Sequence, residues 1–124
     1  MRLFVYGTLL SGESNHHQLE GSRLLGHHRT EPGYTLVRLR ASLRSYPALL
    51  EGGTTSVPGE VYDVEDRVVP ALDRFEGHPD LYRRKGIRLH GLTDVEAYVL
   101  VPAHGARSTI IESGDWRKGI PGSG

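Results

Sequence analysis

The stretch EDRVVPALDRFE, residues 65–76, predicts the one convincing helix of the chain. Val68, Leu72 and Glu76 recur at the four-residue spacing that places side chains on one face of a helix. Gly77, which follows, is the residue type that most often ends a helix. The pattern therefore indicates a short amphipathic helix whose core-facing stripe ends in an acidic side chain.

Short runs rich in β-branched and aromatic residues lie on both sides of this helix, and glycine or proline bounds most of them. Alternating or continuous apolar residues predict strands at 3–5, 33–39, 47–50, 59–64, 82–89 and 95–101. A short helix is expected at 15–20, with Ser14 as its N-terminal cap. Strands, one helix and then further strands favour an α+β domain built on a mixed, barrel-like sheet.

The length of 124 residues suits one domain with a sizeable core. We expect that domain to span residues 1–116, with 117–124 as a flexible C-terminal tail. The 15 basic and 15 acidic side chains cancel, so no overall field points to nucleic acid or to an anionic membrane. Cysteine is absent, which excludes a thiol nucleophile and a disulfide scaffold. A cytoplasmic protein, monomeric or weakly homodimeric, is the expectation.

Glu76 is the first candidate functional residue. Its spacing places the carboxylate on the core-facing stripe and also at the C-terminal end of the predicted helix. Burial disfavours the charged form of a carboxylate, and so does the negative end of the helix dipole. Both effects would raise the pKa of Glu76 toward the range in which a glutamate exchanges a proton near neutrality. The alternative is a boundary glutamate whose stem packs while its head reaches water.

The second candidate is the glycine-flanked loop YGTLLSG, residues 6–12, directly after the first predicted strand. Such a loop can turn successive backbone N–H groups inward and form an anion-binding nest. The spacing from Gly7 to Gly12 matches the start of a nucleotide-binding P-loop, but Glu13 stands in the place of its lysine and would repel phosphate. A carboxylate ligand and a simple strand-ending turn both remain compatible with the loop.

The histidines raise the question of a metal site. They include two adjacent pairs, His16 with His17 and His27 with His28, whose side chains diverge on a helix or strand. The sequence contains no HExxH motif or comparably dense ligand set, so no metal is expected. The basic run at 83–85 is interpreted as a solvated strand edge.

Three blocks of sequence carry a family resemblance. They are FVYGTL at 4–9 followed by Gly12 and Asn15, YPAL at 46–49 with GEVY at 59–62, and LDRFEGHP at 72–79 followed by Tyr82 and Arg84. Together they resemble the γ-glutamylcyclotransferase-like family, specifically its γ-glutamylamine cyclotransferase (AIG2-like) branch. The resemblance covers residues 3–101.

The resemblance implies a small mixed β-barrel with flanking helices and an enzyme that needs neither metal nor other cofactor. The implied reaction is intramolecular cyclisation of a γ-glutamyl group, in a γ-glutamylamine-type substrate, to 5-oxoproline with release of the free amine. The site residues it implies are Glu76 as general acid/base, Tyr6, Gly7, Thr8 and Leu9 as the substrate-binding loop, and Tyr46 and Tyr82 as candidate pocket residues. The alternative is a non-catalytic module on the same fold that binds a small γ-glutamyl or amino-acid ligand.

Overall fold

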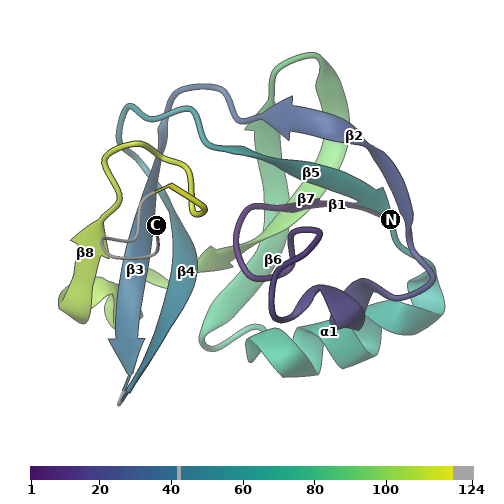
Figure 1. Ribbon diagram of the computed structural model, residues 1–124, viewed down its shortest axis with the longest axis horizontal. Coiled ribbons are helices and arrows are strands. Elements are labelled where there is room, and N and C mark those ends of the chain that lie inside the picture. The colour runs from purple at the N-terminus through teal and green to yellow at the C-terminus, as the bar shows by residue number, and fades with distance from the viewer. Residues whose placement is uncertain (42, 119–124) are drawn as a thin grey trace.

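The computed structural model of the protein describes residues 1–41 and 43–118 (Figure 1). The strands are β1 (Arg2–Val5), β2 (Arg23–Arg29), β3 (Tyr34–Ala41), β4 (Arg44–Glu51), β5 (Pro58–Asp63), β6 (Tyr82–Leu89), β7 (Leu92–Leu100) and β8 (Ser108–Ile110). The helices are α1 (Val69–Glu76) and the 3₁₀ helices η1 (His16–Leu19), η2 (Asp66–Val68) and η3 (Pro102–Arg107).

Five of the strands curl into a barrel-like sheet in the order β2, β5, β1, β7, β6 (Figure 1). β1 pairs antiparallel with β5 and parallel with β7, so the sheet is mixed. The two outer strands meet through a bridge between Thr30 and Leu89 and a hydrogen bond of 3.0 Å from the His90 N–H to the Arg29 carbonyl. The mixed, barrel-like α+β architecture predicted from the sequence is confirmed.

The sheet forks at β7. β6 pairs with β7 along its whole length, whereas β1 and β4 both run parallel to β7 and pair with it at separate positions. Leu3 of β1 lies opposite Glu96, and Leu49 of β4 lies opposite Val99. β3 and β8 continue the branch that begins with β4. The barrel and the β4–β3–β8 branch therefore share one strand and diverge from it.

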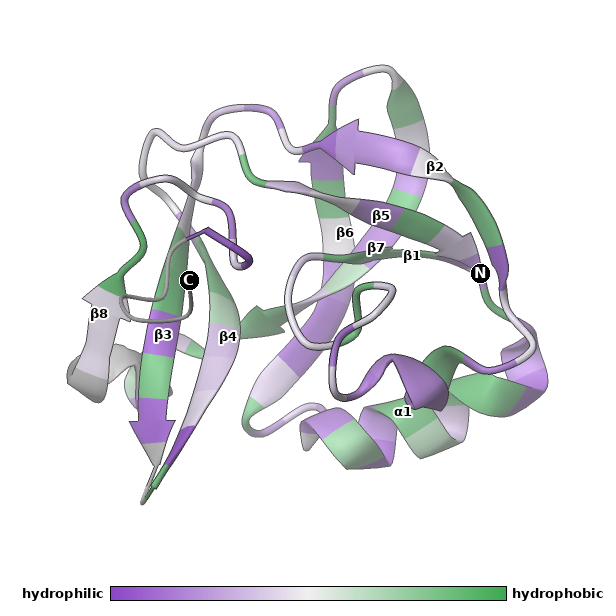
Figure 2. Ribbon diagram, in the orientation of Figure 1, coloured by the Kyte–Doolittle hydropathy of each residue, from purple (hydrophilic) through white to green (hydrophobic). Residues whose placement is uncertain are grey.

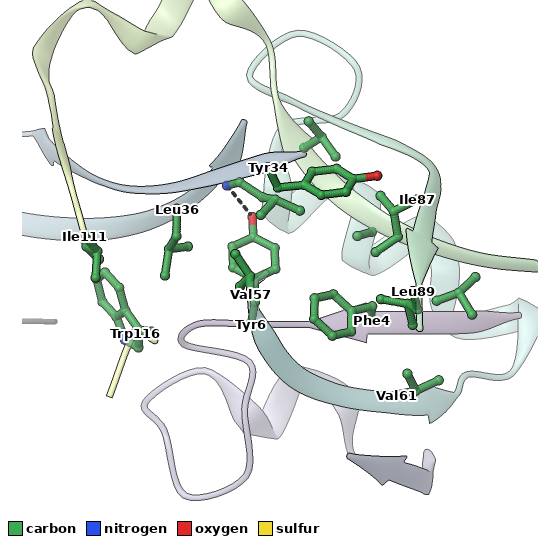
Figure 3. Packing of buried hydrophobic residues seen from close by; sticks show 14 residues of the cluster. Phe4, Tyr6, Tyr34, Leu36, Val57, Val61, Ile87, Leu89, Ile111 and Trp116 are labelled. Carbon is green, nitrogen blue, oxygen red and sulfur yellow. Dashed lines mark hydrogen bonds between the residues drawn. The ribbon is translucent and has the colours of Figure 1, made fainter. Parts of the chain in front are cut away.

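The phenol of Tyr6 fills the fork. Its hydroxyl donates a hydrogen bond of 2.7 Å to the Tyr98 carbonyl of β7. It also accepts one of 3.2 Å from the Leu49 N–H of β4 (Figure 3). The hydroxyl thus satisfies two backbone groups that the divergence of the strands would otherwise leave unpaired. Tyr6 also packs beside Phe4 inside the barrel, with ring centroids 6.3 Å apart.

Both faces of β1 are buried, which explains its uninterrupted apolar run (Figure 2). Phe4 points into the barrel, and its neighbours Leu3 and Val5 point to the other face, because side chains alternate along a strand. On that outer face they join a second cluster with Leu19 of η1 and Leu72 of α1. This second cluster holds η1 and α1 against the barrel wall.

The predicted helix at 65–76 is divided in two. The 3₁₀ helix η2 covers its first part, and α1 begins at Val69 with Pro70 in the first turn, where proline removes no helical hydrogen bond. Gly77 ends α1 in the left-handed conformation, with φ of 67°. Leu72 is fully buried and fixes which face of α1 meets the sheet.

Three elements of the described chain were absent from the sequence prediction, namely β2, η3 and β8. η1 forms where a short helix was expected, but it begins after Asn15 without a side-chain cap, so the role given to Ser14 was wrong. Of the segment predicted as a tail, Arg117 donates a hydrogen bond to the Ser11 carbonyl, while residues 119–124 lie outside the described residues. No helix in the described ranges is long and apolar enough to cross a membrane.

Candidate active site

A cleft of about 710 Å³ opens beside the fork, between the loop that follows β1, the C-terminal end of α1 and the β3–β4 hairpin. The structure brings together all the residues predicted for the site, which line this cleft: Tyr6, Gly7, Thr8, Leu9, Tyr46, Glu76 and Tyr82. They come from four separate parts of the chain. Tyr46 stands at the rim, with 38% of its surface exposed, and Tyr82 lies deeper.

Glu76 is the one carboxylate among the described residues that line the cleft. Its side chain is half-buried, and removal of its carboxyl group from water raises the pKa of Glu76 to about 7. No described residue donates a hydrogen bond to it, so no such bond compensates this desolvation. A group with such a pKa is present in both protonation states near neutral pH and can both accept and return a proton.

Three tyrosines surround this carboxyl group, and their hydroxyl groups donate hydrogen bonds to other residues. Burial raises the pKa of Tyr6, Tyr82 and Tyr98, and the nearby charge of Glu76 raises each of them further. The Tyr82 hydroxyl donates to the Pro47 carbonyl at 2.6 Å, and the Tyr98 hydroxyl donates to Asp73 at 2.7 Å. These phenols stay neutral near pH 7 and form walls of the cleft around Glu76.

The β1–η1 loop, residues 6–15, forms the opposite wall. The Leu10 N–H donates to the Gly7 carbonyl at 3.0 Å, and the Asn15 backbone and side-chain N–H groups donate to the carbonyl and hydroxyl oxygens of Thr8 at 2.9 and 3.0 Å. The backbone N–H groups of Thr8 and Leu9 donate to no described residue. An anion-binding nest needs successive backbone N–H groups without a partner, in a loop that other hydrogen bonds hold in place, and this loop provides both.

Gly7 is required by its contact with β4. A Cβ atom at this position would lie 2.2 Å from Cγ of Pro47, so any side chain would force the loop away from the strand. Pro47 is buried in β4, and its carbonyl is the partner of Tyr82. The glycine therefore holds the loop against the branch that carries the other side of the cleft.

Arg84 and Asp73 fix α1 to the barrel, and this is where the sequence interpretation was wrong. The Arg84 guanidinium donates to both oxygens of Asp73, at 3.0 and 3.3 Å, and to Glu96 at 2.6 Å, with 23% of its side chain exposed. Burial alone would raise the pKa of Asp73, but the bonds from Arg84 and Tyr98 hold it below its ordinary value. Arg84 is a structural anchor, not part of a solvated edge.

Cationic side chains line the mouth of the cleft, and sequence reasoning did not find them. Arg40 at the end of β3 and Arg44 at the start of β4 both line it, and neither forms an ion pair with a described residue. His104 of η3 lies on the same rim. Their separation from Glu76 in the chain explains why no local motif marked them.

The histidine pairs do not converge. Among the described residues, no group of three or more histidine, aspartate or glutamate side chains could hold a metal ion. His16 Nδ1 instead lies 2.8 Å from the Leu9 carbonyl oxygen, and His27 Nε2 lies 3.4 Å from a carboxylate oxygen of Glu60.

Known proteins resemble this chain over most of its length. Residues 3–118 match the family model described as γ-glutamyl cyclotransferase, AIG2-like. A Vibrio cholerae protein, provisionally described as a γ-glutamylcyclotransferase, is 45% identical over 114 residues, which cover 92% of this chain and 93% of that protein. γ-Glutamylaminecyclotransferase A of Danio rerio is 38% identical over 72% of this chain and 58% of its own length.

A solved structure repeats the fold. The crystal structure of an AIG2-like protein from Mus musculus superposes with a TM-score of 0.69 at 27% identity, covering 86% of this chain and 82% of that one. The match of the family model over nearly the whole chain, together with the relatives that share it, identifies the chain as a member of the γ-glutamyl cyclotransferase, AIG2-like family.

Proposed function

We propose that the protein cyclises the γ-glutamyl group of a γ-glutamylamine to 5-oxoproline and releases the free amine, with Glu76 as general acid and base. In this reaction the α-amino nitrogen of the substrate attacks its own γ-carbonyl carbon. A C–N bond to that nitrogen forms, and the C–N bond to the leaving amine breaks. The α-nitrogen gives up two protons as it changes from an ammonium group to a lactam N–H, and the leaving nitrogen takes up both and departs as an ammonium ion. Glu76 would carry these protons one at a time, so the step needs no water and no oxidant.

The observation that carries this proposal is the raised pKa, about 7, of a carboxyl group that lines the cleft beside three buried tyrosines. The ionised form of Glu76 takes a proton from the substrate's α-ammonium group, which exposes the nucleophilic lone pair. The protonated form then delivers that proton to the departing amine. A carboxyl group with the ordinary pKa of about 4.3 would be a poor donor for this second step.

The β1–η1 loop supplies the orientation. The free N–H groups of Thr8 and Leu9 are suited to the α-carboxylate of the glutamyl group, which would leave the α-amine beside Glu76 on the facing wall. Nucleophile and electrophile belong to one molecule, so the enzyme gains most by holding the chain in a folded, near-attack conformation. The cleft volume of about 710 Å³ leaves room for the leaving half beyond the glutamyl group.

The relatives support the choice of substrate class. Membership in the family supports a γ-glutamylcyclotransferase in general, and the name of the Danio rerio relative supports the γ-glutamylamine type. The test is to incubate the protein with γ-glutamyl-n-butylamine and to measure 5-oxoproline and butylamine together. Equal amounts of both products are expected, with none from the N-acetylated substrate, whose nitrogen cannot attack. Release of glutamate in place of 5-oxoproline would show a hydrolase and overturn the proposal.

A further inference from the structure

Glu60 is a buried carboxylate that lies outside the cleft. It projects from β5 and only 1% of its surface is exposed. Its Oε1 accepts hydrogen bonds from the Ser11 N–H at 2.8 Å and the Tyr62 hydroxyl at 3.1 Å, and its Oε2 accepts one from the Ser11 hydroxyl at 2.8 Å. His27 Nε2 approaches Oε2 at 3.4 Å. Two of the three hydrogen bonds that this buried carboxylate accepts therefore come from one residue, Ser11.

Ser11 belongs to the β1–η1 loop, two residues after Leu9. Its backbone N–H and hydroxyl bind Glu60, and its carbonyl accepts a hydrogen bond from Arg117. Arg117 also lies 3.8 Å from the Glu13 carboxylate in the same loop. Every polar atom of Ser11 is therefore held by a residue distant in sequence, although Ser11 itself lies on the surface.

A second contact links this anchor to the cleft side of the loop. The ring of Tyr62, whose hydroxyl binds Glu60, lies against the ring of His16 with centroids 5.6 Å apart. His16 Nδ1 in turn lies 2.8 Å from the Leu9 carbonyl. The peptide next to the free N–H groups is thus connected to Glu60 through side chains as well as through the main chain.

Two turns close the loop between these anchors. Hydrogen bonds of 3.0 Å run from the Leu10 N–H to the Gly7 carbonyl and from the Glu13 N–H to the Leu10 carbonyl. Ser11 lies in the second turn, and the peptides of Thr8 and Leu9 lie in the first. A displacement of Ser11 would therefore strain the turn that holds the free N–H groups.

We propose that Glu60 is a positioning residue for substrate binding. Its hydrogen bonds to Ser11 act as a clamp that fixes the β1–η1 loop, so that the free N–H groups of Thr8 and Leu9 point into the cleft. Arg117 completes the clamp from the C-terminal segment. The part of this inference that concerns activity rests on the proposed cyclotransferase function, whereas the part that concerns loop geometry does not.

The protonation of Glu60 agrees with this role. Burial alone would raise the pKa of Glu60, but the hydrogen bonds from Ser11 and Tyr62 and the charge of Arg117 hold it below its ordinary value. The group therefore stays ionised near neutrality, where Glu76 titrates, and it keeps accepting from the loop throughout the proposed proton transfers.

The test compares Ser11→Ala, Glu60→Ala and Arg117→Gln with two controls. Thr30→Val is the matched structural control, because Thr30 is fully buried and its hydroxyl accepts a hydrogen bond of 2.9 Å from the Val57 N–H, away from the loop. Glu60→Gln is the conservative control. The amide oxygen of the introduced glutamine can still accept the hydrogen bond from the Ser11 N–H. The amide nitrogen can donate to the Ser11 hydroxyl, which then accepts a hydrogen bond in place of donating one.

Amide hydrogen exchange measures loop geometry without reference to activity. We expect exchange at residues 10–15 to be about tenfold faster in Ser11→Ala and Glu60→Ala, to change little in Glu60→Gln, and to be unaffected in Thr30→Val. Ser11 is exposed, so Ser11→Ala stays folded even where the loss of Glu60 does not. Unchanged exchange of the loop in Ser11→Ala and Arg117→Gln would overturn the clamp.

Kinetics then separate a positioning role from a purely structural one. Donors that bind the substrate carboxylate equally in the ground and transition states affect KM more than kcat. The clamp variants should therefore raise KM for γ-glutamyl-n-butylamine by about fivefold or more, with kcat changed less than about twofold. Thr30→Val should leave both constants unchanged in spite of its lower stability. A wild-type protein that releases no 5-oxoproline would refute the proposed function, and the exchange data would still decide the clamp.

Discussion

Asp73 and Glu76 lie three residues apart on α1, and their carboxyl groups occupy opposite electrostatic surroundings. Asp73 accepts hydrogen bonds from Arg84 and Tyr98, and its pKa is lowered. Glu76 accepts none from the described residues, and burial raises its pKa to about 7. One turn of helix thus carries one carboxyl group with a lowered pKa and one with a raised pKa. This separation agrees with an anchoring role for Asp73 and with the proton-transfer role proposed for Glu76.

The first prediction concerns turnover. Glu76→Gln keeps the shape of the side chain but can neither accept nor deliver a proton, so kcat should fall by about 10²- to 10⁴-fold. Release of 5-oxoproline from γ-glutamyl-n-butylamine measures it, and circular dichroism checks that the variant is folded. A folded Gln variant with wild-type turnover would remove Glu76 from the mechanism.

The second prediction concerns the pH dependence of the wild-type enzyme. The ionised form of Glu76 must accept the first proton, so kcat/KM should fall about tenfold per pH unit on the acidic side of its titration. The midpoint of this limb should lie near the raised pKa of about 7. A midpoint near the ordinary glutamate value of about 4.3 would contradict the desolvated site.

The third prediction is that the catalytic carboxylate lowers stability. The pKa of Glu76 is higher in the folded state, at about 7, than in the unfolded chain, so the folded state binds more protons between these two values. The free energy of unfolding should therefore fall as pH rises through this window. Glu76→Gln should be more stable than wild type at pH 8, by up to about 3 kcal/mol, and the difference should vanish at about pH 4. Urea denaturation at both pH values measures it.

The fourth prediction has the opposite sign. The pKa of Asp73 is lowered in the fold, so its contribution to stability is present above the unfolded value of about 3.9 and is lost as pH falls further. Asp73→Asn should cost about 1–3 kcal/mol at pH 7 and less at pH 3. Glu65→Gln is the control, since the ion pair that Glu65 forms with Arg67 is exposed to solvent and should contribute little to stability. Equal losses in the two variants would exclude the anchoring role of Asp73.

The fifth prediction concerns the leaving amine. Arg40 and Arg44 line the mouth of the cleft without an ion-pair partner among the described residues, so a carboxylate on the leaving half should be favoured. We expect γ-glutamylalanine to have a KM about three- to tenfold below that of its uncharged alaninamide counterpart, and the ratio to shrink at high salt. The double variant Arg40→Gln/Arg44→Gln should abolish the ratio. Arg74→Gln, an exposed arginine near Glu76 that does not line the cleft, should leave it intact.

The sequence predicted those parts of the cleft lining that depend on local patterns of neighbouring residues. The spacing of Leu72 and Glu76 on one helix face, and the glycine loop after the first strand, depend only on neighbouring residues, and both elements line the cleft. Arg84 was misjudged because its partners Asp73 and Glu96 lie on two other elements, so a run of basic residues on a strand gave no hint of them.

The missing strands have a similar cause. β2 has the sequence RLLGHHR, in which a glycine and two histidines break the apolar alternation, and its side chains are mostly exposed or half-buried. β8 is only three residues long. The fork could not be foreseen because it depends on parallel pairings of β7 with β1 and β4, between residues far apart in the chain. For the same reason, nothing in the sequence indicated the hydrogen bond from the Leu49 N–H to the Tyr6 hydroxyl.

The fork at β7 also has a consequence for protein engineering. The residues proposed for proton transfer and for holding the glutamyl group lie on α1 and on the loop after β1, whereas the arginines at the mouth belong to the separate branch that begins with β4. The phenol of Tyr6, the hydrogen bond from Tyr82 to the Pro47 carbonyl and the pairing of Leu49 with Val99 join the two parts. We therefore expect that exchanging the arginine-bearing ends of β3 and β4 between homologues would alter the preferred leaving amine and leave the residues proposed for cyclisation unchanged.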